Sequence, residues 1–230
     1  MVASAVRAAF VNRDVCVYAA EVSNSGCTDA KESEHERVRL EIAVAAHACA
    51  GRFIYFGTCS VNDLHASKSL YVLHKRAMEH PAAKHPRHVI FRPPQVARNT
   101  PTPHTFLDYL FARIARSERF SIWANSTRNV TDIDDVAQIA QALVVNQGVV
   151  HETINVVHSR SISVVEIVSR FELNTSRRAV FDEIPIGKAY SIDCSRIETT
   201  VATCGVDLIG DYRRKALRKY YGPGYKRSLS

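Results

Sequence analysis

One stretch of the chain reads Phe53-Ile54-Tyr55-Phe56-Gly57-Thr58-Cys59-Ser60-Val61 and is followed, after a short segment, by Tyr71-Val72-Leu73-His74-Lys75. The apolar run at its start predicts a strand buried on both faces. Tyr71 and Lys75 are four positions apart, so on a helix they lie on the same face. The stretch therefore predicts a buried strand that ends in hydroxyl residues and precedes a helix carrying a tyrosine beside a lysine.

Strand-like and helix-like segments alternate on both sides of this stretch. Further strands are expected at residues 15–20, 89–91 and 154–157. Helices are expected at residues 32–50, 101–120, 136–143, 163–172 and 212–220. Alternation of this kind predicts parallel strands joined by right-handed crossovers, which is an α/β fold. Such a sheet binds its ligand at the carboxyl ends of its strands.

The pairing of Tyr71 with Lys75 has two interpretations. An ammonium beside a phenol stabilises the ionised phenol, so the pair can transfer protons, and Thr58 or Ser60 at the strand end could share a substrate oxygen with Tyr71. The same spacing also occurs where a tyrosine lies at the edge of a core and the lysine is solvated. The spacing alone leaves both interpretations open.

The segment from Arg52 to Glu79 resembles the extended short-chain dehydrogenase/reductase family, the NAD-dependent epimerases and dehydratases that act on nucleotide sugars. Further stretches continue the resemblance in the family's order from about residue 15 to residue 170. They are His88-Val89-Ile90-Phe91-Arg92-Pro93-Pro94-Gln95-Val96, Arg128-Asn129-Val130-Thr131-Asp132-Ile133-Asp134-Asp135-Val136-Ala137, Thr153-Ile154-Asn155-Val156 and Ser163-Val164-Val165-Glu166-Ile167-Val168.

The resemblance implies a shortened Rossmann-like parallel sheet with helices on both faces and a small C-terminal lobe on the substrate side. Residues 1–100 would form the dinucleotide-binding part. Residues 101–230 would form the substrate-side part, with a strand near 153–157 returning to the sheet.

The resemblance also implies roles for the residues of the opening stretch. Tyr71 would be the general base and acid, Lys75 would lower the pKa of Tyr71 and bind the nicotinamide ribose, and Thr58 would orient the substrate oxygen. Ser60 is the reserve candidate, and its alternative role is a loop hydroxyl that caps backbone groups.

The cofactor implied is NAD or NADP. Its expected contacts are Lys75 together with Ala3, Ser4, Ala20, Pro94, Gln95 and Val96. The family has a glycine-rich turn near the start of the sheet, where pyrophosphate approaches a helix N-terminus. Residues 1–10 occupy that place here, and alanines stand where glycines are expected. Each added Cβ would crowd the phosphates.

Arg128 matches an arginine that pairs with the diphosphate or ribose of the nucleotide sugar, and a guanidinium suits such a contact. The alternative is a surface ion pair with Asp132 or Asp134. Asp134 and Asp135 are expected to cap or anchor the helix that follows them.

The function expected is that of an NAD(P)-dependent epimerase or ketoreductase acting on a nucleotide sugar. Dehydration is less favoured because Asp63 lies near the catalytic threonine without a matching glutamate. The alternative is a catalytically idle member that keeps the fold for ligand sensing or protein association, since the glycine-rich turn is degenerate. A homodimer is expected by analogy, because helices that carry the tyrosine often pair between subunits in this family.

The composition limits which other kinds of function and location are expected. The chain has 230 residues, 46% of them hydrophobic, and a net charge of +7. Much of the excess positive charge lies in residues 213–219, which we interpret as a solvated helix. A nucleic-acid-binding module is therefore the third hypothesis, after the enzyme and the idle protein. The six cysteines form no C-x-x-C pair, and prolines interrupt His80, His85 and His88, so no metal site is expected. No long apolar run indicates a membrane span, and a cytoplasmic location is expected.

Overall fold

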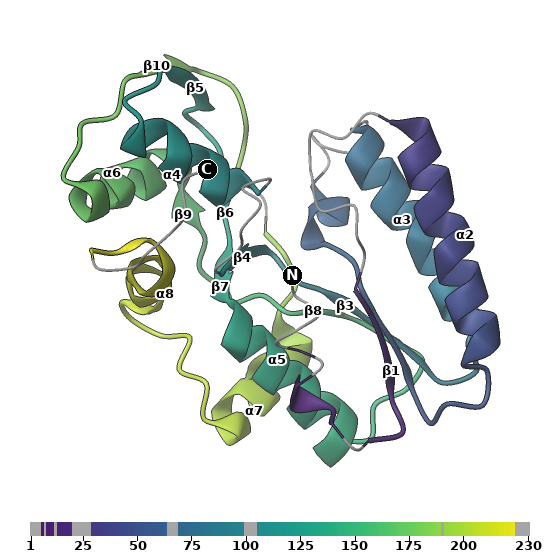
Figure 1. Cartoon of the computed structure of the whole chain (residues 1–230). Coiled ribbons are helices and arrows are strands. Elements are labelled where there is room, and N and C mark those ends of the chain that lie inside the picture. Colours follow the sequence, from purple (N-terminus) through teal and green to yellow (C-terminus); the bar gives the residue numbers. More distant parts are fainter. Residues whose placement is uncertain are drawn as a thin grey trace.

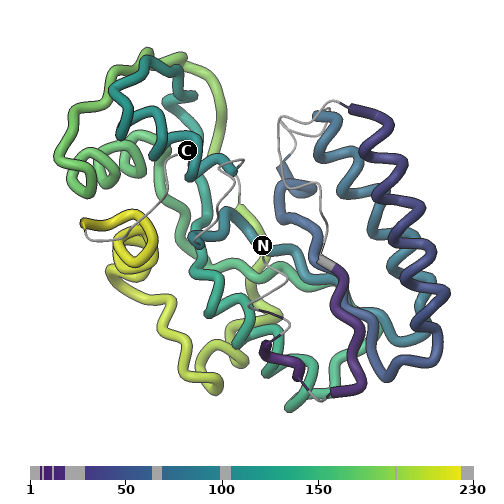
Figure 2. The backbone as a smooth tube through the Cα atoms, in the orientation of Figure 1, coloured from purple at the N-terminus to yellow at the C-terminus, as the bar shows by residue number. Residues whose placement is uncertain are grey.

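The computed structural model describes residues 6, 8–11, 13–19, 29–63, 69–98, 105–189 and 191–223. A parallel sheet lies at its centre with helices on both faces, and a second group of helices lies to one side of this sheet (Figure 1). The trace in Figure 2 shows that the chain passes from the sheet to this second group and returns to the sheet afterwards.

Within the described residues, four strands form the central sheet. They are β1 (Cys16–Ala19), β2 (Phe53–Phe56), β3 (His88–Arg92) and β8 (Glu152–Asn155), in the order β1-β2-β3-β8. All neighbours are parallel, and Ile54 of β2 lies opposite Val17 of β1 and Val89 of β3. The parallel sheet predicted from the alternating pattern is confirmed. A strand from the second half of the chain, β8, completes it.

Strand β2 is buried on both faces, as its apolar run predicts. Its four side chains are at most 4% exposed. Phe53 and Tyr55 pack with Leu40 and Met78 in one core cluster, whereas Ile54 and Phe56 belong to another. Complete burial of an aliphatic or aromatic side chain contributes roughly 1.5–3 kcal/mol, so this strand is a main source of the sheet's stability.

Different helices supply the two clusters. The Phe53 side is covered by α2 (Ala30–Ala46) and α3 (Leu70–Ala83), which lie side by side (Figure 1). The opposite side is covered by α5 (Ile133–Gln141), the short π-helical segment η2 (Ala142–Asn146) and α7 (Ser195–Cys204). The sequence pattern did not predict α7 and placed it in an irregular stretch.

The apolar residues of α2 do not all face the core. Val38 and Ile42, which repeat at helical spacing, are 41% and 62% exposed. Glu36 and Leu40 are buried instead. The apolar spacing therefore marks a face of α2 that points away from the sheet.

The second group contains α4 (Phe106–Ala115), α6 (Val164–Thr175) and α8 (Tyr212–Tyr221). Their shared core includes Phe171 and Tyr221, whose rings lie 4.8 Å apart between centroids. The helix expected at residues 101–120 is thus shorter, whereas those at 163–172 and 212–220 are confirmed. No helix in the ranges described above is long and apolar enough to cross a bilayer.

Three short two-stranded pairs accompany this group within the described residues. They are β4 (Gln95–Ala97) with β7 (Val130–Asp132), β5 (Phe120–Trp123) with β10 (Phe181–Ile184), and β6 (Thr127–Arg128) with β9 (Ile162–Ser163). The first two pairs are parallel and the third is antiparallel. The sequence pattern missed all of them, since two to four residues carry too little periodicity.

Helix α8 is anchored to the start of α5. Asp132 caps α5 by accepting a hydrogen bond from the Asp134 amide at 3.0 Å, as the acidic sequence predicts. Tyr220 Oη and Lys219 Nζ donate to the Asp132 carboxylate, both at 2.7 Å. Tyr212 Oη donates to Asp135 at 2.5 Å. The basic terminal helix is therefore part of the packed structure.

We expect Tyr221→Phe to lower the free energy of unfolding by about 1.5–3 kcal/mol. The Tyr221 hydroxyl donates to the buried Asp108 carboxylate at 2.9 Å, and the substitution removes this bond while the ring keeps its packing. Urea unfolding followed by circular dichroism measures the change.

Tyr109→Phe is the matched control, because Tyr109 lies on α4 and is 41% exposed. Equal stability of both variants and the wild type would show that the Asp108 bond contributes nothing.

Candidate active site

The loop after β2 places Thr58 at the carboxyl end of the sheet. Thr58 caps the 3-10 helix η1 (Cys59–Asn62), because its Oγ1 accepts a hydrogen bond from the Ser60 amide at 3.2 Å. Thr58 Oγ1 also donates to Ser60 Oγ at 3.2 Å. Thr58 is 8% exposed and Ser60 is half-buried. Both expected hydroxyls therefore lie together, with Ser60 holding Thr58.

Tyr71 lies in the first turn of α3 and is hydrogen-bonded to Thr58. The Lys75 ammonium, one turn further, is 5.8 Å from the centroid of the Tyr71 ring. The structure therefore brings together Thr58, Tyr71 and Lys75, as the sequence pattern predicted.

A buried carboxylate holds the lysine. Glu36 of α2 has no exposed surface, and its Oε1 accepts from Lys75 Nζ at 3.3 Å. Its other oxygen, Oε2, lies 2.9 Å from His74 Nε2. Lys75 is itself only 2% exposed. An ammonium this deeply buried requires a counter-charge, and Glu36 supplies it.

The pKa values differ from the expectation that Lys75 activates the phenol. Burial raises the pKa of Tyr71 to about 12; the hydrogen bond with Thr58 opposes the rise, and Cys59 and Glu36 add to it. Burial also lowers the pKa of Lys75, an effect that the Glu36 carboxylate opposes. The expected lowering of the Tyr71 pKa was wrong for the chain by itself, because burial outweighs the neighbouring cation.

The segment expected along the nicotinamide lies next to this group. The Cys59 amide donates to the Pro93 carbonyl at 3.0 Å, and the Gly57 amide donates to the Phe91 carbonyl at 2.8 Å. These bonds bring the loop after β2 against the loop after β3, from which Pro94, Gln95 and Val96 continue into β4. All three residues are half-buried.

Arg128 lies in the second group, on β6. Its guanidinium lies over the Phe106 ring at 5.2 Å from the centroid and donates to the Thr127 carbonyl at 2.8 Å. The carboxylates considered as its alternative partners, Asp132 and Asp134, bind Lys219 instead. The surface ion pair was therefore wrong, and the substrate role stays a prediction.

The expected contacts at Ala3, Ser4 and Ala20 lie outside the described residues. The described strands follow one another in a single direction across the sheet, β1-β2-β3-β8. Dinucleotides bind where the strand order of such sheets reverses. The described residues thus contain the groups proposed for the nicotinamide end, and they do not include those proposed for the pyrophosphate.

Sequence reasoning missed Glu36 and His74. The available signal was that Glu36 lies four positions before Leu40, on the same face of the helix, and Leu40 is buried. Among the residues that the structure describes, no group of three histidine, cysteine or acidic side chains could hold a metal ion.

No protein-family model matches the chain, and no curated protein matches its sequence. Solved structures match in fold. UDP-glucuronic acid 4-epimerase from Bacillus cereus, in complex with UDP-glucuronic acid and NAD, is 18% identical, with 87% of this chain and 73% of that chain covered and a TM-score of 0.64. UDP-glucose 4-epimerase from Thermotoga maritima with UDP-glucose is 14% identical, with 90% and 77% covered and a TM-score of 0.64.

A third match is TunA, an NAD-dependent NDP-hexosamine 5,6-dehydratase involved in tunicamycin biosynthesis. It is 15% identical, with 97% of this chain and 80% of that chain covered and a TM-score of 0.69. Together these likenesses confirm the Rossmann-like α/β fold that the sequence resemblance implied.

We expect Glu36→Gln to destabilise the protein by about 3 kcal/mol at neutral pH, because Lys75 would stay buried without a counter-charge. The pKa of folded Lys75 would then fall further below that of the unfolded chain. The unfolded state would bind more protons, so the free energy of unfolding of the variant would rise with pH up to about 10. Urea titrations at several pH values measure this slope.

Glu34→Gln is the control on the same helix, since Glu34 is exposed and pairs with Arg37 on the surface. A Glu36→Gln variant as stable as the wild type at all pH values would disprove a structural role for the ion pair.

Proposed function

We propose that the chain is an NAD(P)-dependent enzyme acting on a nucleotide sugar, as an epimerase or ketoreductase. The observation that carries the proposal is the position of Tyr71 beside Thr58 at the carboxyl end of a parallel sheet, with Lys75 one helical turn away. Structures of the same fold include a UDP-glucuronic acid 4-epimerase in complex with UDP-glucuronic acid and NAD, and the enzyme WbmH in complex with NAD+.

In the proposed reaction, Tyr71 removes the proton from a sugar hydroxyl, and Thr58 binds the same oxygen. Bound oxidised nicotinamide would accept the hydride from the adjacent carbon and place a positive charge beside the phenol. Such a charge is needed, because Tyr71 with a pKa near 12 is a poor base at neutral pH. An epimerisation would be complete once the hydride has returned to the opposite face of the same sugar carbon and Tyr71 has returned its proton to the oxygen. A reduction would use only this second half, with the hydride supplied by a reduced nicotinamide.

The residues at the nicotinamide end fit the cofactor. Lys75 would bind the ribose, and Pro94, Gln95 and Val96 would pass beside the ring through backbone contacts. For these contacts Lys75 would share its protons between the cofactor and Glu36, since an ammonium has three donors. Arg128 would bind the diphosphate of the sugar nucleotide. Residues 1–100, including Ala3, Ser4 and Ala20, would hold the rest of the dinucleotide.

A catalytically idle protein is the second candidate, and three observations favour it. Glu36 already binds Lys75, and the pKa of Tyr71 is raised. Alanines also replace the expected glycines near residue 3. Isothermal titration with NAD and NADP separates the candidates: binding near micromolar, about 8 kcal/mol, favours the enzyme, and no detectable binding of either favours the idle protein.

We expect Tyr71→Phe to keep cofactor affinity and lower turnover by about 100-fold or more, because only the ionisable oxygen is removed. UDP-glucose and UDP-glucuronic acid serve as trial substrates, with product followed by chromatography and NAD affinity by titration. Lys75→Met should instead weaken NAD binding.

Tyr109→Phe again serves as the control. Normal turnover of Tyr71→Phe would exclude Tyr71 from the mechanism. Circular dichroism of Lys75→Met separates a lost ribose contact from unfolding caused by an unpaired Glu36.

We further propose a cytoplasmic homodimer paired through α2 and α3. Val38, Ile42, Leu70 and Leu73 of these helices are 41–62% exposed, although they are apolar. Two adjacent helices that expose apolar residues on one side are suited to pairing with a second copy. Among the described cysteines, Cys49, Cys194 and Cys204 are free thiols, which suits a reducing compartment.

Ile42→Glu combined with Leu73→Glu should convert the dimer to a monomer, because two charges on each copy would be buried at the interface. Light scattering coupled to size-exclusion chromatography measures the mass. Ile209→Glu is the control, since Ile209 is 77% exposed and lies outside these helices. A monomeric wild type would refute this interface.

A further inference from the structure

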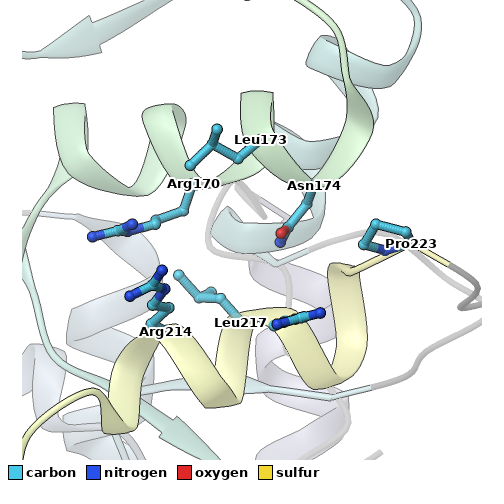
Figure 3. Close-up of a pocket in the computed structure, with 7 residues that line it drawn as sticks. Arg170, Leu173, Asn174, Arg214, Leu217 and Pro223 are labelled. Carbon is cyan, nitrogen blue, oxygen red and sulfur yellow. The ribbon is translucent and has the colours of Figure 1, made fainter.

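A pocket of about 230 Å³ lies between α6 and α8, in the second group of helices. It is lined by Arg170, Leu173, Asn174, Arg214, Leu217, Arg218 and Pro223. Arg170 and Arg214 face each other across the gap between the two helices, and the Asn174 amide points into the same gap (Figure 3). The described part of the lining thus contains three cations and no carboxylate.

The cations of this pocket are weakly neutralised. Arg170 pairs with Glu166 of the same helix at 3.5 Å, and Arg214 pairs with Asp211, the residue before α8, at 3.2 Å. The four side chains are 31–67% exposed. Exposed pairs of this kind contribute little and yield readily to a better partner. In the described part of the chain, Arg218 has no carboxylate partner.

The other bonded cations of α8 have a structural role. Lys219 holds Asp132 and Asp134, and Arg213 donates to the Ser161 carbonyl at 2.5 Å. Among the residues that the structure describes, Arg214 and Arg218 make no comparable contact with another element. The charges of α8 therefore separate into a set that anchors the helix and a set that lines the pocket.

We propose that this pocket binds a small phosphate-bearing anion, such as a diphosphate or a phosphate ester. Guanidinium groups present paired N–H donors that match phosphate oxygens, and like charges gathered in one pocket repel one another until an anion enters. Leu217 and Pro223 supply an apolar wall for the part of the ligand that carries the phosphate. The pocket is separate from Tyr71, since α6 and α8 lie on the opposite side of the molecule from α3 (Figure 1).

Isothermal titration with inorganic diphosphate tests the proposal, at fixed ionic strength and without divalent cations. We expect saturable binding with a Kd of about 1 mM or tighter. The triple variant Arg170→Gln, Arg214→Gln, Arg218→Gln should bind at least about tenfold more weakly, because each guanidinium donates charge-assisted bonds.

A charge-matched control is the triple variant Arg177→Gln, Arg178→Gln, Lys215→Gln, whose side chains are exposed outside the pocket. It should bind diphosphate as the wild type does. Equal weakening in both triple variants would show diffuse attraction and overturn the proposal, as would the absence of saturation. Single Arg218→Gln, checked by thermal melting, keeps the test valid if the triple variant does not fold.

A final titration uses a DNA duplex of unrelated sequence in place of diphosphate. If the duplex binds through the same arginines and diphosphate does not compete, the surface is a nucleic-acid site and the proposal is wrong. Competition by diphosphate at the expected Kd supports the proposal.

Discussion

The structure depends on a single constraint, which is that β2 must be covered on both faces and paired along both edges. Its side chains alternate between two cores, so α2 and α3 must lie on one face while α5 and α7 lie on the other. Pairing with β1 and β3 fixes where the strand ends. Thr58 follows directly at that end, and the packing of Met78 against Tyr55 sets how far α3 lies from it. The closeness of Tyr71 to Thr58 is thus a result of core packing.

The same burial creates a conflict in the proposed chemistry. Burial raises the pKa of Tyr71 and lowers that of Lys75, so it disfavours the charged form of each group. Glu36 stabilises the ammonium, but its negative charge opposes ionisation of the phenol. A protein that used Tyr71 as a base would need a further positive charge close to it, and the oxidised nicotinamide is such a charge. The active and idle interpretations therefore differ in what binds beside Lys75, and the fold is common to both.

The sequence predicted the parts of the structure that have a long or strongly apolar local pattern. The buried strands, α3, α6 and α8 all belong to this class. The short two-stranded pairs were not predicted, because they form through pairing between segments that are distant in the sequence. The burial of Glu36 on α2 could not be predicted from local spacing, because it depends on distant partners, Lys75 and His74, that lie on α3. The pKa of Tyr71 was missed for a related reason: spacing shows which charge is near, whereas burial depends on the whole core.

Helix α8 shows how charge and packing can be combined in one segment. Composition alone described it as a solvated basic end, yet Leu217, Tyr220 and Tyr221 are buried. Its anchor, Asp132, ends β7 and begins α5, and β7 pairs with β4 in the register Val96 to Thr131. Helix α8 therefore supports β4, the strand that carries Gln95 and Val96, through Asp132 and β7. Another side of α8 lines the arginine pocket. A basic helix can serve in this way as a structural support for one site and as a wall of another, because its cations lie on different sides of its axis.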